Sequence, residues 1–308
     1  MNQSLTALEG VRVGHWTDQA ARTGCTVLLF PEDGATMSAE VRGGAPGTRE
    51  TPLLAPDKAI EKVHALLLTG GSAFGLAASG GVVQYLEQQG VGVLTPGGRV
   101  PIVPSAVIFD LAVGDSNVRP KAEHGYLACE QASRDPVPNG QIGAGTGAMC
   151  GKLLGFEHAQ AGGLGNARLE LGGVQVCALV VANPTGDIVD TQGNVLAGAR
   201  KTDGSRLSEL ERLEILSAGQ NKFLQHTNTT LIAVGTDANL SKLECSILAQ
   251  AAQMGLARAT RPSHTPHDGD TSFVFSVGHQ SPPPIIALVA AVQTVVHQAM
   301  VAAATFSR

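Results

Sequence analysis

The sequence has few charged residues and no run of basic ones. Asp, Glu, Lys and Arg make up 15% of the 308 residues, and the formal net charge is −5. Nucleic-acid binding needs a stripe of Lys or Arg that neutralises phosphates, so we expect no nucleic-acid partner. With 43% apolar residues, such a low charge also excludes intrinsic disorder and indicates a chain with a substantial core.

Aromatic residues and paired cysteine motifs are also scarce. Phe, Trp and Tyr make up 4% of the chain, so the core must consist mainly of Val, Leu, Ile and Ala. The five cysteines lack CxxC spacing, which excludes a regular disulfide framework and indicates reduced thiols. Residues 1–10 lack the basic and apolar regions of a secretory signal. We therefore expect a cytoplasmic protein.

One apolar segment, residues 285–304, is long enough to cross a membrane. However, Gln293, Thr294, His297 and Gln298 fall on one face of the expected helix. The pattern therefore favours an amphipathic helix packed on the core, and we expect no membrane partner.

Apolar runs rich in β-branched residues predict five strands, at residues 25–30, 64–68, 174–181, 229–234 and 271–277. Helices are predicted at residues 72–89, 206–217, 241–257 and 285–304. The third helix starts with a capping box formed by Ser241 and Glu244. Strands that are apolar on both faces and alternate with apolar helices are typical of sheets covered by helices in layers. No linker divides the chain, so we expect a single domain over residues 1–308.

The glycine-rich segment 143–152, GAGTGAMCGK, is the first candidate for chemistry. It lacks two groups of the Walker phosphate loop, because Thr146 and Leu153 stand where Gly and Ser or Thr are required. It matches a loose dinucleotide fingerprint but follows a turn instead of a strand, so we expect no nucleotide cofactor. The segment either approaches another backbone closely or lines a pocket with Lys152 as its polar group.

Residues 264–270, HTPHDGD, combine two histidines with two aspartates. Their spacing matches neither the helical HExxH motif nor an EF-hand, and Pro266 excludes a helix. We therefore expect no metal. The segment is either a solvated turn before a strand or a place where Asp268 and Asp270 orient a catalytic group.

Read together, these segments resemble the L-aminopeptidase/D-esterase family, which includes β-aminopeptidases and the nylon-oligomer hydrolase. Taken alone, Thr229 before a strand is unremarkable, because threonine is common in strands. The resemblance rests on an ordered series of motifs: GVRVGH (10–15), VRGGAPG (41–47), LTGGSAFGL (68–76), PSAVIFD (104–110), GAGTG (143–147) with Lys152, VANPTG (181–186), NTT (228–230) and DGDT (268–271).

The resemblance implies a precursor that cuts itself ahead of its nucleophile. The cut would fall between Asn228 and Thr229, giving a large chain of residues 1–228 and a small chain of residues 229–308. The implied fold is a four-layer αββα sandwich that resembles N-terminal-nucleophile hydrolases with different connectivity. Family members form homo-oligomers, tetramers or larger, and need no cofactor.

The resemblance also assigns roles to four other residues. Asn183 is the expected donor to the oxyanion, and Lys152 is expected to place positive charge near the nucleophile. Asp268 and Asp270 are expected to lie behind Thr229 and orient its hydroxyl or amine.

A threonine hydroxyl is a poor nucleophile and needs a base. After cleavage the free α-amine of Thr229 supplies one, because its pKa of roughly 7.7–8.0 lies near neutrality. Before cleavage the hydroxyl of Thr229 attacks the carbonyl of Asn228, and water hydrolyses the resulting ester. We expect an amide hydrolase that releases N-terminal residues from short peptides, amino-acid amides or esters.

One position departs from the family pattern. Some relatives have tyrosine where this chain has Phe109, and phenylalanine cannot donate a hydrogen bond. The oxyanion would then rely on Asn183 with backbone amides, or on water, and Phe109 would be a wall of the pocket.

Two other functions stay open from the sequence. One is acyl transfer of the ornithine acetyltransferase type, although the sequence context of that family's cut is absent here. The other is an unprocessed, non-catalytic binding or assembly protein. The preferred acyl group (α-, β- or D-aminoacyl, or a synthetic oligoamide) depends on pocket walls that the sequence does not locate.

Overall fold

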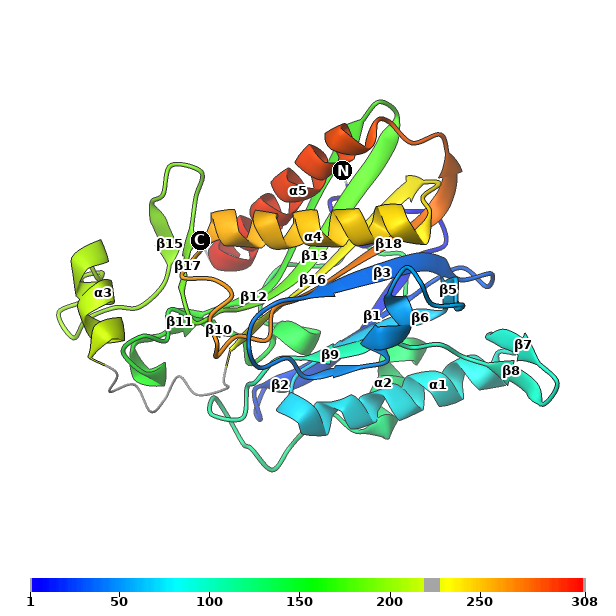
Figure 1. Cartoon of the computed structure of the whole chain (residues 1–308). Helices are drawn as coiled ribbons and strands as arrows, with labels where there is room; N and C mark the ends of the chain where they lie inside the picture. The colour runs from blue at the N-terminus through cyan, green and yellow to red at the C-terminus, as the bar shows by residue number, and fades with distance from the viewer. Residues whose placement is uncertain (1, 219–227, 307–308) are drawn as a thin grey trace.

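The computed structural model describes residues 2–218 and 228–306, and it shows a four-layer αββα sandwich (Figure 1). Two sheets face each other in the middle, and a pair of helices covers the outer face of each. The predicted fold class is therefore confirmed.

The first sheet has five strands in the order β1-β2-β6-β9-β4. Its neighbours pair antiparallel except for β6 and β9, which run parallel. The strands and the two helices packed on them are β1 (Arg12–Asp18), β2 (Thr23–Leu29), β6 (Ala65–Thr69), β9 (Ser105–Val107), β4 (Thr48–Arg49), α1 (Ala78–Gln88) and α2 (Ala122–Glu130).

The second sheet has six strands in the order β12-β13-β16-β18-β3-β5, and its one parallel pair is β16 with β18. The helix α4 connects that parallel pair, as a parallel connection requires a crossover. The strands and covering helices are β12 (Gly163–Leu171), β13 (Val174–Asn183), β16 (Thr229–Ala238), β18 (Thr271–Gln280), β3 (Ala35–Val41), β5 (Lys62–Val63), α4 (Lys242–Ala259) and α5 (Ile285–Thr305).

Smaller elements connect the two sheets and surround their ends. They are η1 (Leu5–Ala7), η2 (Thr51–Leu54), η3 (Ser72–Ala77), η4 (Gly143–Gly145), η5 (Phe156–His158), β7 (Val93–Thr95), β8 (Gly98–Val100), β10 (Met149–Cys150), β11 (Gln160–Ala161), β14 (Asp187–Val189), β15 (Val195–Ala197), β17 (Thr260–Arg261) and α3 (Glu209–Ser217).

Strict alternation along the central strands divides the core into separate layers. On β16, Leu231 and Ala233 face the other sheet, whereas Ile232 and Val234 face the helices α4 and α5. The same alternation on β2 sends Leu28 between the sheets and its neighbours toward α1 and α2. Because successive side chains of a strand point to opposite faces, a strand between two apolar layers must be apolar throughout.

All five predicted strands and all four predicted helices are present, with boundaries shifted by a few residues. The predicted helix 72–89 begins as the 3₁₀ helix η3 before continuing as α1. The capping box at the start of α4 is confirmed, because Ser241 accepts from the amide of Glu244 and the Glu244 carboxylate accepts from the amide of Ser241.

The helix α5 is the one helix in the described part of the chain that is long and apolar enough to span a membrane. It packs on β12, β13 and α4, as expected of a core helix. The predicted polar face is wrong at His297, which is 5% exposed, although Thr294 and Gln298 are exposed as expected. Burial lowers the pKa of His297, which lies close to Asp190.

Gly165 allows α5 to lie directly on β12. A Cβ at this position would overlap the carbonyl oxygen of Ala299 in the helix backbone. We predict that Gly165→Ala lowers the free energy of unfolding by about 1–3 kcal/mol, the usual range for an overpacked core. Gly80→Ala is the matched control, because the new methyl group would have no neighbour closer than 3.8 Å and alanine favours a helix. Denaturant unfolding measures both, and equal stabilities would contradict this account of the packing.

Candidate active site

The ends of β13 and β16 bring Asn183 and Thr229 directly opposite each other. The two strands pair antiparallel from Val176 with Thr236 to Asn183 with Thr229, without interruption. Asn183 is fully buried and Thr229 is 4% exposed. The sheet register therefore fixes the distance between the expected nucleophile and the expected oxyanion donor.

The hydroxyl of Thr229 and one backbone amide converge on the carbonyl group of Asn228. The Thr229 Oγ1 donates to the Asn228 oxygen at 2.5 Å, and the amide of Gly269 donates to the same oxygen at 2.9 Å. The Gly269 hydrogen bond polarises the carbonyl group that Thr229 would attack. The hydroxyl of Thr229 and the amide of Gly269 therefore both lie against the carbonyl group of the Asn228–Thr229 bond.

Asn183 connects the site to Lys152. The Lys152 Nζ donates to the Asn183 Oδ1 at 2.8 Å and to its backbone oxygen at 3.0 Å. The amide of Met149 donates to the same Oδ1 at 3.0 Å, and the Asn183 Nδ2 donates to the Phe109 oxygen at 3.3 Å. These contacts fix the amide orientation, with its oxygen toward Lys152 and its nitrogen toward the Phe109 side.

Lys152 is 2% exposed, and burial lowers its pKa to about 7. The negative charges of Asp268 and Asp270 raise the pKa in the opposite direction, but burial has the larger effect. A lysine in this environment changes its charge near neutral pH. The family resemblance assigned Lys152 to the site, but no sequence pattern indicated how deeply it is buried.

Asp268 and Asp270 are both buried, at 1% and 2% exposure, beside the start of β16. Asp268 accepts from the amide and hydroxyl of Thr185 with one oxygen, and from the amide and hydroxyl of Thr265 with the other. Asp268 therefore joins the turn between β17 and β18 to the bend that follows β13.

Asp270 holds the first residues of β16. One of its oxygens accepts from the amide of Thr230 at 2.8 Å, and the other accepts from the amide and ring of His264. Burial raises the pKa of Asp270, although the hydrogen bond from His264 opposes that change. The described residues contain no group of three or more His, Cys, Asp or Glu side chains arranged for a metal ion. The arrangement favours the orienting role for the two aspartates over a solvated turn.

The glycine-rich segment 143–152 approaches other backbones closely. The amides of Gly143 and Ala144 donate to the hydroxyls of Thr17 and Thr26 at 2.8 and 3.0 Å. A Cβ at Gly145 would lie 2.5 Å from the amide nitrogen of Leu164. The segment thus packs the two sheets together and then delivers Lys152 to the site.

Thr229 lines a cavity of about 260 Å³ between the loop before β4, the start of η3 and the end of β9. The other lining residues are Ala45, Pro46, Gly47, Ser72, Ala73, Val107 and Phe109. Phe109 is therefore a wall of the pocket, as its replacement of tyrosine predicted.

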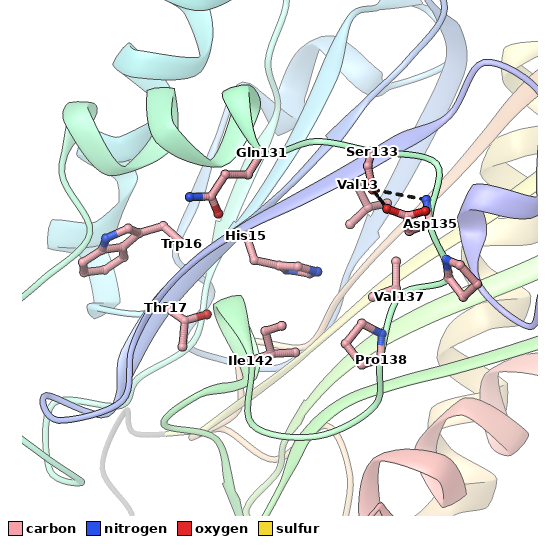
Figure 2. A pocket seen from close by; sticks show the side chains of 11 residues that line it. Val13, His15, Trp16, Thr17, Gln131, Ser133, Asp135, Val137, Pro138 and Ile142 are labelled. Atoms are coloured by element: carbon pink, nitrogen blue, oxygen red, sulfur yellow. Dashed lines mark hydrogen bonds between the residues drawn. The ribbon is translucent and has the colours of Figure 1, made fainter.

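A second cavity, of about 380 Å³, lies where β1 meets the segment after α2 (Figure 2). The ring of His15 points into it, contacts the Thr26 hydroxyl at 3.0 Å and has its pKa lowered to about 4 by burial. This cavity shares no lining residue with the one at Thr229 and contains none of the predicted site residues.

Gly269 is the site residue that sequence reasoning missed. It lies between Asp268 and Asp270, and its position in the DGD motif is the only signal of its role. The hydrogen bond that its amide makes depends on the bridge between Asn228 and Asp268, two residues far apart in the sequence.

Comparisons with known proteins agree with this fold. The sequence profile of Peptidase family S58 matches residues 3–307. An uncharacterized aminopeptidase of Mycobacterium leprae is 44% identical over 293 residues, covering 89% of this chain and 78% of that protein. A 6-aminohexanoate-oligomer endohydrolase of a Kocuria species is 32% identical over 270 residues, covering 86% of this chain and 72% of its own.

Two solved structures share the fold. A β-aminopeptidase of a Burkholderia species superposes with a TM-score of 0.73 at 23% identity, covering 98% of this chain and 86% of its own. The L-aminopeptidase D-Ala-esterase/amidase of Ochrobactrum anthropi, a variant of the Ntn hydrolase fold, gives 0.70 at 20% identity and covers 98% and 85%. The class of protein is therefore a hydrolase with an Ntn-type sandwich. The chain belongs to Peptidase family S58.

Gly269 also leaves room for the hydroxyl of Thr229. A Cβ there would lie 2.8 Å from the Thr229 Oγ1 and 2.6 Å from the carbonyl oxygen of Ala45. We predict that Gly269→Ala lowers kcat/KM for a chromogenic amide by roughly a hundredfold, since small displacements of reacting groups are that costly. Gly97→Ala is the control, because its nearest neighbour would be 3.9 Å away in the hairpin of β7 and β8. Thermal unfolding shows whether both variants fold. An unchanged kcat/KM in folded Gly269→Ala would show that Thr229 does not need the space that this glycine leaves.

Proposed function

We propose that the chain cuts its own Asn228–Thr229 bond and then uses Thr229 as an N-terminal nucleophile on short peptides, amino-acid amides or esters. The observation that carries the proposal is the convergence of the Thr229 hydroxyl and the Gly269 amide on the carbonyl group of Asn228. Membership of a peptidase family and the printed activities of the relatives support hydrolysis over acyl transfer.

Self-cleavage needs no cofactor, because every bond change and proton transfer involves Asn228, Thr229 and water. The Thr229 oxygen adds to the carbonyl carbon of Asn228, and the negative charge on the carbonyl oxygen is stabilised by the Gly269 amide. The bond to the Thr229 nitrogen then breaks, that nitrogen takes up the hydroxyl proton, and an ester remains. Water hydrolyses the ester and leaves Asn228 with a carboxylate and Thr229 with a free amine and hydroxyl.

Substrate hydrolysis reuses the same groups. The free amine of Thr229 accepts the hydroxyl proton as the oxygen attacks the substrate carbonyl, and it returns the proton to the leaving amine. Asn183 and the Gly269 amide donate to the oxyanion of the intermediate, and water then releases the acyl group. The protonated form of Lys152 lowers the pKa of the Thr229 amine, because the two positive charges repel each other through the intervening Asn183.

Cleavage at this bond is compatible with an intact fold. In the six-stranded sheet, β16 and β18 belong to the proposed small chain, whereas β12, β13, β3 and β5 belong to the large chain. The two chains would therefore share one sheet and its apolar layers on both faces. We propose that they stay associated after cleavage, in the cytoplasm and as homo-oligomers.

Thr229→Ala removes the hydroxyl, so we predict one uncut polypeptide without amide hydrolase activity. Thr229→Ser is the matched control, because it keeps the hydroxyl and should still give two chains, with residual activity. Denaturing gel electrophoresis of both purified variants measures the outcome. Two chains from Thr229→Ala would show that another group performs the cleavage.

Lys152→Met removes a positive charge beside the Thr229 amine. The amine pKa should then rise toward its ordinary value of roughly 7.7–8.0, so the acid limb of the pH profile of kcat/KM moves to higher pH. In the native enzyme Lys152 and the amine titrate as a coupled pair, and the acid limb belongs to that pair. Lys201→Met, which removes a partly exposed ion pair with Glu211, is the control. A limb that stays in place or moves to lower pH would contradict the assignment.

A further inference from the structure

The strand β1 lies at the edge of the five-stranded sheet, and most of its outer side is not covered by another strand. Val13 exchanges two backbone hydrogen bonds with Ser133 on that side, at 3.0 and 3.1 Å. Backbone groups of an antiparallel strand alternate between its two sides, so those of His15 and Thr17 point outward as well. Neither residue makes a backbone hydrogen bond on that side with the residues that the structure describes. The edge of β1 is therefore open from His15 to Thr17.

The segment that pairs with the start of β1 cannot extend to cover this open edge. Continued antiparallel pairing would place Gln131 opposite His15, but the amide of Gln131 caps α2 by donating to the Leu127 oxygen at 3.1 Å. Farther along the same segment, Pro136 and Pro138 have no amide hydrogen to donate. The outward groups of β1 are therefore left to water or to a ligand, as at other uncovered sheet edges.

The second cavity, of about 380 Å³, runs along this open edge (Figure 2). Its lining includes all three of residues 15–17, although successive side chains of a strand point to opposite faces of the sheet. A cavity that contacts three successive residues of one strand lies beside the edge, where the backbone is accessible. Val137, Pro138 and Ile142 also line the cavity and give it apolar surface.

The His15 ring points into the cavity without adding a positive charge (Figure 2). Burial lowers the pKa of His15 to about 4, so the ring is neutral near pH 7. Its Nδ1 lies 3.0 Å from the Oγ1 of Thr26, which also accepts from the amide of Ala144 at 3.0 Å. These contacts hold the ring in place before a ligand binds, and a preformed site loses less entropy on binding.

Asp135 is the one charged residue among the described residues that line this cavity. Its Oδ2 accepts from the Ser133 hydroxyl at 2.9 Å, and no cation of the described chain pairs with it. Because Ser133 pairs with Val13, the carboxylate lies at the Val13 end of the cavity (Figure 2). An ammonium group at that end of a ligand would complement the charge.

From these observations we infer that the cavity beside β1 binds a short, extended peptide, which adds to the open edge as a strand and places its free amino terminus at Asp135. Hydrogen bonds to the backbone of His15 and Thr17 supply the affinity, as in other cases of strand addition. At roughly 3.3 Å per residue, the open edge matches about three peptide residues. The volume of about 380 Å³ leaves room for such a segment with small side chains, not for the whole edge strand of a second copy. The site is separate from Thr229, so binding does not depend on cleavage of the chain.

Trp16 is the one tryptophan of the chain and lines this cavity, so its fluorescence reports binding here and not at Thr229. We use the full-length Thr229→Ala variant, so that the probe is not consumed, and mass spectrometry confirms that the probe stays intact. L-Ala-L-Ala-L-Ala amide should change the emission in a saturable way, with a Kd on the order of 1 mM. The same peptide methylated at both internal amide nitrogens cannot donate to the strand edge and should bind at least about tenfold more weakly.

Amide hydrogen exchange, measured by NMR on the same variant, tests the strand addition at the residues concerned. The amides of His15 and Thr17 should exchange at least about tenfold more slowly at saturating peptide, because they gain hydrogen bonds. The amide of Trp16 is the internal control, since it already faces β2. Unchanged exchange at both outward amides, or equal binding of the methylated and unmethylated peptides, overturns the inference.

A matched pair of variants tests the place of the amino terminus. Acetylating the amine of the peptide should weaken binding by about two- to fivefold, as expected for an exposed ion pair. With Asp135→Asn the acetylated and free peptides should bind equally. Asp33→Asn removes another exposed carboxylate, outside this cavity, and should keep the preference for the free amine. A preference that survives in Asp135→Asn would contradict the assignment of Asp135.

A second copy of the chain is the alternative occupant of this edge. In that case the emission of Trp16 and the exchange of the His15 and Thr17 amides would change with protein concentration when no peptide is present. Such a concentration dependence would overturn the inference, whereas values that stay constant until peptide is added support it.

Discussion

The uninterrupted pairing of β13 with β16 determines where every other group of the site lies. It places Asn183 opposite Thr229, and a slip of β16 by one residue would turn the Thr229 side chain to the opposite face of the sheet. The parallel pairing of β16 with β18 then brings the DGD turn beside the same strand end. Close packing of the side chains in the two layers makes any other register costly.

Burial of charge is the second constraint. Lys152, Asp268 and Asp270 are all at most 2% exposed, in a protein with few charged residues overall. Burial lowers the pKa of the lysine, and the negative charges of Asp268 and Asp270 oppose that change. Burial raises the pKa of Asp270, and the hydrogen bond from His264 opposes that change. The network is positioned by hydrogen bonds from threonines, from His264 and from backbone amides.

Much of this organisation could be predicted from the sequence. Strand and helix positions follow from apolar periodicity, and the five residues assigned by family resemblance lie together, although their catalytic roles stay predictions. Three features depend on long-range contacts that no local pattern contains. They are the Gly269 hydrogen bond to the Asn228 carbonyl, the hydrogen bonds that Asp110 accepts from Thr23 and Gly71, and the burial of His297. The burial of His297 shows that a polar residue on the expected outer face of a helix can be covered by another segment.

The central claim is that the bond between Asn228 and Thr229 breaks and that the new amine serves the adjacent hydroxyl. Intact mass spectrometry of the purified, active native protein, combined with N-terminal sequencing, tests it most directly. The account predicts two chains, of residues 1–228 and 229–308, and a second amino terminus that reads Thr-Thr-Leu-Ile. Active protein that consists only of the uncut chain would contradict it.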